Sequence, residues 1–144
     1  MVEVLIAGIL LASALAAVSR ISVAALSGSA NLSDRARIEA AINDNIQAMQ
    51  KEDSYYTDAW IIKNGGQEAL KSACTNPSEA LRSHLQTVAQ EPRLPAITRK
   101  FDISSIPGIL RIVYSFEGPE QQIKAEQRII EMTPNFAAKC YSTR

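Results

Sequence analysis

The stretch that decides the fold is residues 4–18, VLIAGILLASALAAV, in which only Gly8 and Ser13 interrupt a run of apolar side chains. After Ser19 and Arg20 the apolar character resumes and continues to Leu26. As a helix, residues 4–26 would be about 34 Å long, because each residue adds about 1.5 Å. The hydrocarbon core of a bilayer is about 30 Å thick, so the pattern predicts a membrane span.

Three interpretations of this stretch compete. A buried helix of a soluble domain is normally amphipathic, whereas this one is apolar on every side for four turns. A cleaved secretory signal fits the small residues Ala14 and Ala16, but signal peptides begin with a basic segment, and the only charge before Arg20 is Glu3. The pattern therefore favours the third interpretation, an anchor that is retained and used for assembly.

Two features of the span bear on assembly. Glu3 places a carboxylate at its start, which is unfavourable in lipid unless the group lies in the headgroup region or meets a partner. Small residues also recur four positions apart, a spacing that lets helix backbones approach closely. These candidate helix-packing residues are Gly8, Ala12, Ser13, Ala16 and Ala17.

Residues 1–12, MVEVLIAGILLA, resemble the N-terminal signature of type IV pilins and type II secretion pseudopilins. In that family a basic leader ends in Gly, a prepilin peptidase cuts after it, and the new N-terminal residue, usually Phe, is methylated. The motif then runs Phe-Thr-hydrophobic-hydrophobic-Glu into an apolar helix. Met1, Val2 and Glu3 match its last three positions, whereas the Gly, Phe and Thr are absent, so we expect the leader to lie upstream of Met1.

The resemblance implies a bacterial inner-membrane protein with a single span and a periplasmic head, which later joins a pilus or pseudopilus that can reach the cell surface. Its partners would be other pilin subunits, the prepilin peptidase and the inner-membrane assembly machinery. In the family the glutamate of the motif neutralises the N-terminal amine of a neighbouring subunit and sets axial register, and Glu3 would inherit this role by position. Arg20, near the C-terminal end of the span, and Arg35 and Arg37 beyond it would favour a cytoplasmic head, a bias that a basic leader would reverse.

Helical periodicity continues beyond the span. Ile38, Ile42, Ile46 and Met49 recur at steps of four, four and three among charged residues, which predicts one apolar stripe on a polar helix. No proline precedes Pro77, so a single helix from about residue 2 to about residue 51 is expected, about 75 Å long. We therefore expect a transmembrane and filament-core helix at 1–26, its amphipathic continuation at 27–52 and a globular head at 53–144.

The first half of the head reads as short helices. Lys63-Asn64-Gly65-Gly66 predicts a turn, followed by a short helix over 67–73. Asn76 as N-cap and Pro77 at the first helical position predict a helix that ends near Gln90. Its expected buried face consists of Ala80, Leu81, Leu85 and Val88.

The second half of the head reads as strands, at 96–103, 109–117 and 122–132, with Gly118-Pro119 forming the turn of a hairpin. The middle strand should bury one face, which carries Leu110, Ile112, Tyr114 and Phe116. The predicted fold class is α+β and pilin-like: a long N-terminal helix packed on a small head with short helices and an antiparallel sheet of about three strands.

Cys74 and Cys140 are the only cysteines. In a chain exported across a membrane they are most simply one disulfide, which would close a long loop and contribute about 4 kcal/mol. Many type IV pilins carry a cysteine pair near the C-terminus, but here the enclosed loop is wider and contains all the predicted strands. Two cysteines and one histidine, without CxxC or HExxH spacing, do not predict a metal site.

Length and composition restrict the function further. The 144 residues suffice for one domain, and 15 basic against 15 acidic side chains leave no domain-wide basic footprint for nucleic acid. Four basic residues could form a local patch that binds DNA at a pilus tip, although a solvated polar face is the favoured interpretation. These residues are Arg93, Arg99, Lys100 and Arg111. His84 is expected at the surface or as a cap, and without a catalytic or phosphate-binding motif neither catalysis nor a cofactor is predicted.

The sequence therefore predicts a structural subunit of a type IV pilus-like filament, a minor pilin that assembles through its N-terminal helix. The cysteine pair and the lack of evident calcium-loop acids favour this over a type II secretion pseudopilin, which stays open as an alternative. A single-pass anchored periplasmic binding domain that never polymerises is a second alternative. A secreted enzyme with a cleaved signal is the least favoured, because no catalytic constellation is evident.

Overall fold

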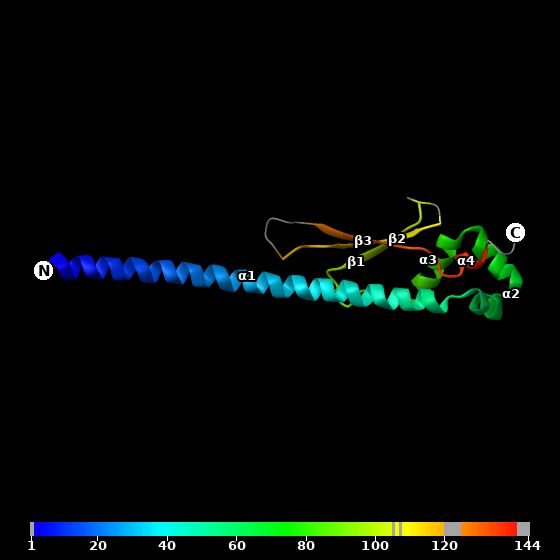
Figure 1. Ribbon diagram of the computed structural model, residues 1–144, viewed down its shortest axis with the longest axis horizontal. Helices are drawn as coiled ribbons and strands as arrows, with labels where there is room; N and C mark the ends of the chain where they lie inside the picture. Colours follow the sequence, from blue (N-terminus) through cyan, green and yellow to red (C-terminus); the bar gives the residue numbers. More distant parts are fainter. Residues whose placement is uncertain (1, 105, 107, 120–124, 141–144) are drawn as a thin grey trace. The chain divides into compact units, whose positions relative to one another are not determined.

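The computed structural model describes the backbone of residues 2–104, 106, 108–119 and 125–140, and all their side chains except those of residues 2–14, 16, 17, 23, 24 and 27. The chain divides into two compact units, Met1–Arg37 and Ile38–Arg144. Figure 1 labels the elements, which follow one another as α1 (Val2–Tyr55), α2 (Asp58–Thr75), α3 (Pro77–Val88), β1 (Thr98–Asp102), β2 (Leu110–Phe116), β3 (Glu126–Met132) and α4 (Ala137–Cys140).

The first unit is the N-terminal part of α1. Among its described side chains, Leu15, Val18, Ile21 and Leu26 are each more than 60% exposed. In the described part of the chain, no helix has a segment of the length and apolarity needed to cross a bilayer. The span predicted over residues 4–26 falls largely on side chains outside that part.

The second unit contains the α+β fold that the sequence predicts. Its three strands lie side by side in the order β1-β2-β3, and both neighbouring pairs are antiparallel (Figure 1). Ile112 at the centre of β2 faces Phe101 of β1 and Ile130 of β3. β1 and β2 begin and end within two residues of the predicted limits, and β3 ends at the predicted Met132, whereas its predicted start at 122–124 lies outside the described residues. The antiparallel sheet and the short helices of the predicted fold are confirmed.

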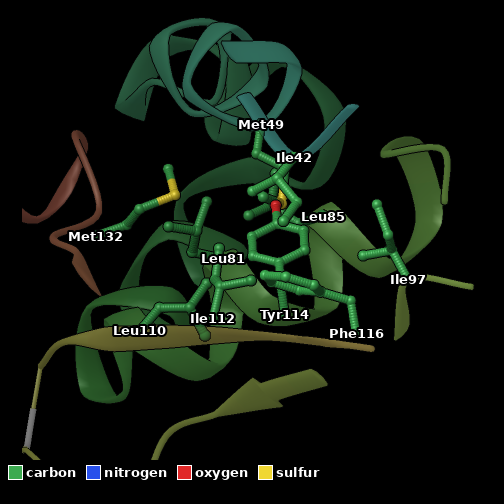
Figure 2. Packing of buried hydrophobic residues seen from close by; sticks show 10 residues of the cluster. All are labelled: Ile42, Met49, Leu81, Leu85, Ile97, Leu110, Ile112, Tyr114, Phe116 and Met132. Carbon is green, nitrogen blue, oxygen red and sulfur yellow. The ribbon is translucent and has the colours of Figure 1, made fainter. Parts of the chain in front are cut away.

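The core of this unit lies between one face of the sheet and the helices. Figure 2 shows Leu110, Ile112, Tyr114 and Phe116 extending from β2 toward Ile42 and Met49 of α1. Leu81 and Leu85 of α3 belong to the same cluster and are fully buried, and Ile97 and Met132 also belong to it. The stripe predicted for the amphipathic helix is confirmed, because Ile38 and Ile46 also pack against the cluster. Burying a large aliphatic side chain contributes about 1.5–3 kcal/mol, so this stripe is enough to fix the second half of α1 on the sheet.

The structure differs from the sequence prediction around α1 and α2. The first helix ends at Tyr55 rather than near residue 51, and a helix that was not predicted begins at Asp58, where the Thr57 side chain accepts a hydrogen bond from the Trp60 amide. Helical structure continues through most of the predicted turn, and only Gly66 leaves it, at φ 76°. Ile61 and Leu70 are buried on either side of the break, so packing keeps both helical segments in place despite the glycines.

Helix α3 begins as predicted and ends two residues early. The Asn76 side chain accepts the Glu79 amide N–H, and Pro77 occupies the first turn. The predicted burial of Val88 is wrong, because this residue is 42% exposed. The chain leaves the helix at Ala89, and Ala89 packs against the core in its place.

The cap at Asn76 gives a first testable prediction. Asn76→Ala is expected to lower the free energy of unfolding by about 1 kcal/mol, because the first turn of α3 loses its side-chain acceptor. Urea unfolding of the full chain, followed by the fluorescence of Trp60, measures this. Asn64→Ala is the control, because Asn64 is exposed and its side chain only donates to the Trp60 carbonyl within the same helix. An equal loss in both variants would contradict the assignment of the cap.

Candidate functional site

The residues predicted to drive assembly are not among the described side chains. This applies to Glu3 and to the helix-packing set Gly8, Ala12, Ser13, Ala16 and Ala17.

The predicted disulfide is present: Cys74 of α2 is bonded to Cys140 of α4, with 5.4 Å between their Cα atoms and 66 positions between them in sequence. The bond therefore ties the last helix of the head to its first long helical segment.

A buried polar cluster, which we call the polar node, joins α1 to the sheet and consists of Asn45, Arg99 and Tyr114. The Asn45 side-chain oxygen accepts hydrogen bonds from the Tyr114 hydroxyl at 2.9 Å and from Arg99 Nη1 at 3.0 Å. The Asn45 amide nitrogen donates to the Gln90 carbonyl at 2.8 Å. One side chain of α1 is thus bonded to β1, to β2 and to the segment that follows α3.

Arg99 is the most heavily bonded member of the polar node. Besides Asn45, its guanidinium donates to the carbonyls of Gln90 at 2.9 Å and Ala89 at 3.2 Å, and to the Glu91 carboxylate at 3.2 Å. The guanidinium also lies 5.0 Å from the centre of the Phe101 ring. The Arg99 side chain is 2% exposed whereas that of Glu91 is 74% exposed, so the charge is held mainly by neutral oxygens.

Burial also fixes the protonation of Tyr114. Loss of hydration raises the pKa of Tyr114 to about 12, although the nearby Arg99 charge acts in the opposite direction. Because the hydroxyl keeps its proton at any physiological pH, it remains the donor to Asn45. Each oxygen of the polar node faces a donor, but Arg99 Nε is buried with no hydrogen-bond partner among the described residues.

Arg99 belongs neither to the basic patch that the sequence allowed nor to the solvated polar face that it favoured, because its side chain is 2% exposed. Arg99 and Lys100 are consecutive in β1, so their side chains point to opposite faces of the sheet, and only Lys100 is exposed. Arg111 forms an ion pair with Glu131 on the neighbouring strand at 3.1 Å. Arg93 lies outside the sheet, so the four residues do not form one cationic surface.

An aromatic cluster lies where α1, α2 and α3 meet, and it consists of Tyr56, Trp60, His84 and Phe136. The Tyr56 and His84 rings stack with centres 4.1 Å apart and planes 10° apart. Trp60 makes T-shaped contacts with both, its centre lying 5.4 Å from that of Tyr56 and 5.1 Å from that of His84, and Phe136 makes a T-shaped contact with Tyr56 at 5.3 Å. His84 is thus half-buried against these rings, so the expectation that it lies at the surface holds only in part.

Two titratable groups beside the aromatic cluster have shifted pKa values. Burial lowers the pKa of His84, although Glu52 and Asp53 oppose the shift. Burial raises the pKa of Asp53, which accepts the Asn135 amide N–H at 3.1 Å and so holds the approach to α4. The fold therefore favours neutral His84 near physiological pH.

The His84 shift predicts how stability depends on pH. The free energy of unfolding should fall as the pH drops from about 7.5 to about 5.5, because the unfolded chain takes up the histidine proton at a higher pH than the folded chain does. Asp53 acts in the opposite sense and at lower pH, since stability from a raised carboxyl pKa is lost as the pH rises through that pKa.

Urea unfolding at several pH values tests this dependence. His84→Gln should be less stable at neutral pH, because ring stacking is lost, but its stability should vary less between these pH values. An unchanged slope in the variant would contradict a role for His84.

The polar node can hold side chains in position, and the aromatic cluster can stack against a ring. Neither cluster places a nucleophile beside a base. Within the described ranges, no group of three or more His, Cys, Asp or Glu side chains could hold a metal ion. No family model, curated protein or solved structure matches the chain.

Proposed function

We propose that the chain is a structural subunit of a type IV pilus-like filament, a minor pilin that assembles through its N-terminal helix. The observation that carries the proposal is the use of α1 in the head. The same helix that starts with the Glu3 motif supplies Ile42 and Met49 to the core of the antiparallel sheet. This is the layout that the resemblance to pilins implies, with one helix serving first as anchor and then as the support of a head.

Assembly would transfer the N-terminal helix from lipid to a bundle of equivalent helices. Small residues suit both environments, because close backbone approach replaces the missing hydrophobic driving force between helices. The described serines fit as well, since the hydroxyls of Ser19 and Ser22 donate to the carbonyls of Leu15 and Val18, each at 2.9 Å. A hydroxyl bonded within its own helix leaves no unsatisfied donor on an apolar surface.

Glu3 would provide register in this assembly. A carboxylate in an apolar bundle is stable when a cation is supplied across the interface, and the N-terminal amine of a neighbouring subunit would be that cation. The membrane and the assembly machinery are the partners before extraction, and other pilin subunits are the partners afterwards.

The polar node, which lies in the head, also supports the proposal. A filament under load requires that each head stay fixed to the helix that holds it. Asn45 bonds α1 to two strands and to the segment after α3, so the second half of α1 cannot slide along the sheet without breaking buried hydrogen bonds. We expect force on the head to pass into α1 through this contact.

The test is the N-terminus and location of the native protein. Intact mass and N-terminal sequencing are made on the chain recovered from membranes and from sheared surface filaments. A methylated N-terminus upstream of Met1 is the expected result. A chain that starts at Met1, or one cut after Ala16, would overturn the proposal.

A substitution separates assembly from anchoring. Glu3→Ala should reduce recovery in filaments at least tenfold while the amount in the membrane stays the same. Glu39→Ala, on the same helix but in the head, is the matched control and should leave both unchanged. If Glu3→Ala enters filaments normally, or if no filament contains the chain, the non-polymerising anchored domain becomes the better description.

A further inference from the structure

The head contains an open hollow of about 520 Å³ between α2 and α3, which we call the Trp60 hollow. Ala69 and Ala73 of α2 and Ala80 of α3 line it, and their small side chains leave the space between the helices unfilled. Trp60 lines the same hollow and is 41% exposed, which makes it one of the most exposed large aromatic side chains in the described part of the head. The hollow is more open than enclosed, so a ligand would rest against its walls rather than be surrounded by them.

One wall of the hollow is aromatic. Tyr56, Trp60 and His84 all line it, and their mutual contacts at 4.1–5.4 Å hold the three rings in fixed orientations. Rings that are already packed lose little entropy when a ligand stacks on them. The wall is therefore a preformed stacking surface.

The rest of the rim consists of hydrogen-bonding side chains, Ser72, Asn76, Glu79 and Ser83. The Asn76 oxygen already accepts the Glu79 amide N–H and the Ser83 hydroxyl already donates to Glu79. The Asn76 amide N–H groups, the Ser83 oxygen and the Ser72 hydroxyl are left to meet the hydroxyl groups of a ligand. A hollow lined only by apolar groups would select a hydrocarbon, whereas this combination of a stacking wall and a polar rim selects a ring with apolar faces and a polar edge.

The charge in the hollow excludes most ionic ligands. Among the described residues, no lysine or arginine lines it, so a phosphate or carboxylate would find no cation from them there. Its single carboxylate, Glu79, is already paired with Arg82, whose Nε donates at 2.8 Å and whose Nη2 donates to the other oxygen. His84 is held neutral because burial lowers its pKa. A cationic ligand would therefore compete with Arg82 for the one available charge.

We propose that the Trp60 hollow binds a neutral saccharide, with one sugar ring stacked on the aromatic wall and its hydroxyl groups bonded to Ser72, Asn76 and Ser83. A pyranose has two faces of C–H groups and an equator of hydroxyls, which is the pattern that this wall and rim complement. The binding site lies wholly within the head and does not depend on whether the chain assembles into filaments.

The experiment uses Trp60 as its own reporter, because it is the only tryptophan. The full chain, kept in solution with a detergent that has no sugar headgroup, is titrated with glucose, galactose, N-acetylglucosamine, maltose, lactose and N,N′-diacetylchitobiose. Choline chloride and inorganic phosphate serve as cationic and anionic probes. We expect a saturable change in Trp60 emission with at least one saccharide, with Kd of about 1 mM or below, as is usual for a ligand of this size.

A variant that fills the Trp60 hollow tests whether the saccharide binds there. Ser72→Gln places a longer side chain into the hollow from an exposed helical position and should weaken the saccharide at least tenfold. Lys71→Gln is the matched control, because the neighbouring residue is exposed and does not line the Trp60 hollow; it should bind as the unmodified chain does. Equal urea midpoints in the three proteins show that both variants fold.

Three results would overturn the proposal. The first is that no saccharide changes the Trp60 emission, or that choline or phosphate saturates it and no saccharide does. The second is that Ser72→Gln binds as tightly as Lys71→Gln. The third is an emission that depends on protein concentration without any added probe, since this would mean that the hollow is covered by a second copy of the chain.

Discussion

Replacing Asn45 with alanine is expected to lower the free energy of unfolding of the head by about 3 kcal/mol. The substitution removes three hydrogen bonds, one each with Tyr114, Arg99 and the Gln90 carbonyl. Tyr114 is fully buried and the Arg99 side chain is 2% exposed, so water cannot take the place of the lost acceptor. The loss should therefore exceed the value of three exposed hydrogen bonds.

Urea unfolding of the full chain measures this loss, and Asn43→Ala is its matched control. Asn43 lies on the same helix two residues earlier and is exposed, so its removal should change stability by less than about 0.5 kcal/mol. Tyr114→Phe alone should lose about 1 kcal/mol, and the double variant with Asn45→Ala should lose less than the sum, because the two residues share one bond. Additive losses would show that the two residues act independently.

Removal of the disulfide is expected to have the largest effect on stability. The Cys74→Ala, Cys140→Ala double variant should lose about 4 kcal/mol, because the bond closes a loop with a sequence separation of 66 and restricts the unfolded chain accordingly. Domains of this kind are stable by about 5–15 kcal/mol in total, so the variant should unfold at a much lower urea concentration.

A reducing agent provides the control for this experiment. It should lower the unfolding midpoint of the unmodified chain to that of the double variant and leave the double variant unchanged. A loss below about 1 kcal/mol would mean that α4 is held by packing rather than by its covalent bond, for example through the buried side chain of Phe136.

Much of the head could be predicted from the sequence because local patterns specify it. The stripe of Ile38, Ile42, Ile46 and Met49 predicted which face of α1 meets the sheet, and alternation along β2 predicted its buried side. The start of α3 followed from Asn76 and Pro77, and the two cysteines are bonded as expected. Each of these patterns lies within a single helix or strand, except the disulfide, for which the sequence offers only one pair of cysteines.

Features that depend on contacts between distant segments were missed. Alternation in β1 places Arg99 on the same side as Phe101, and this signal could have shown that Arg99 faces the core. The acceptors of Arg99 were not predictable, because Asn45 is 54 positions away and the carbonyls of Ala89 and Gln90 carry no side-chain signal. The ring contacts of His84 were not predicted for the same reason, since its partners come from α2 and from the segment between α1 and α2.

The assembly site remains a prediction from sequence. Glu3 and the small residues from Gly8 to Ala17 define it, and their side chains lie outside the described part of the chain. A surface that meets other subunits need not bury anything within a single chain, so the head alone gives no information about it. Only the N-terminus and the Glu3 variant can test it.

The distance in sequence between Asn45 and Tyr114, 69 positions, determines when the head can form on the ribosome. At a translation rate of about 5–20 residues per second, β2 is synthesised several seconds after Ile42 and Met49. During that interval the nascent chain presents its apolar stripe without the strands that cover it. We therefore expect the newly made chain to need a chaperone to shield Ile38–Met49, and to aggregate when it is released before the sheet is complete.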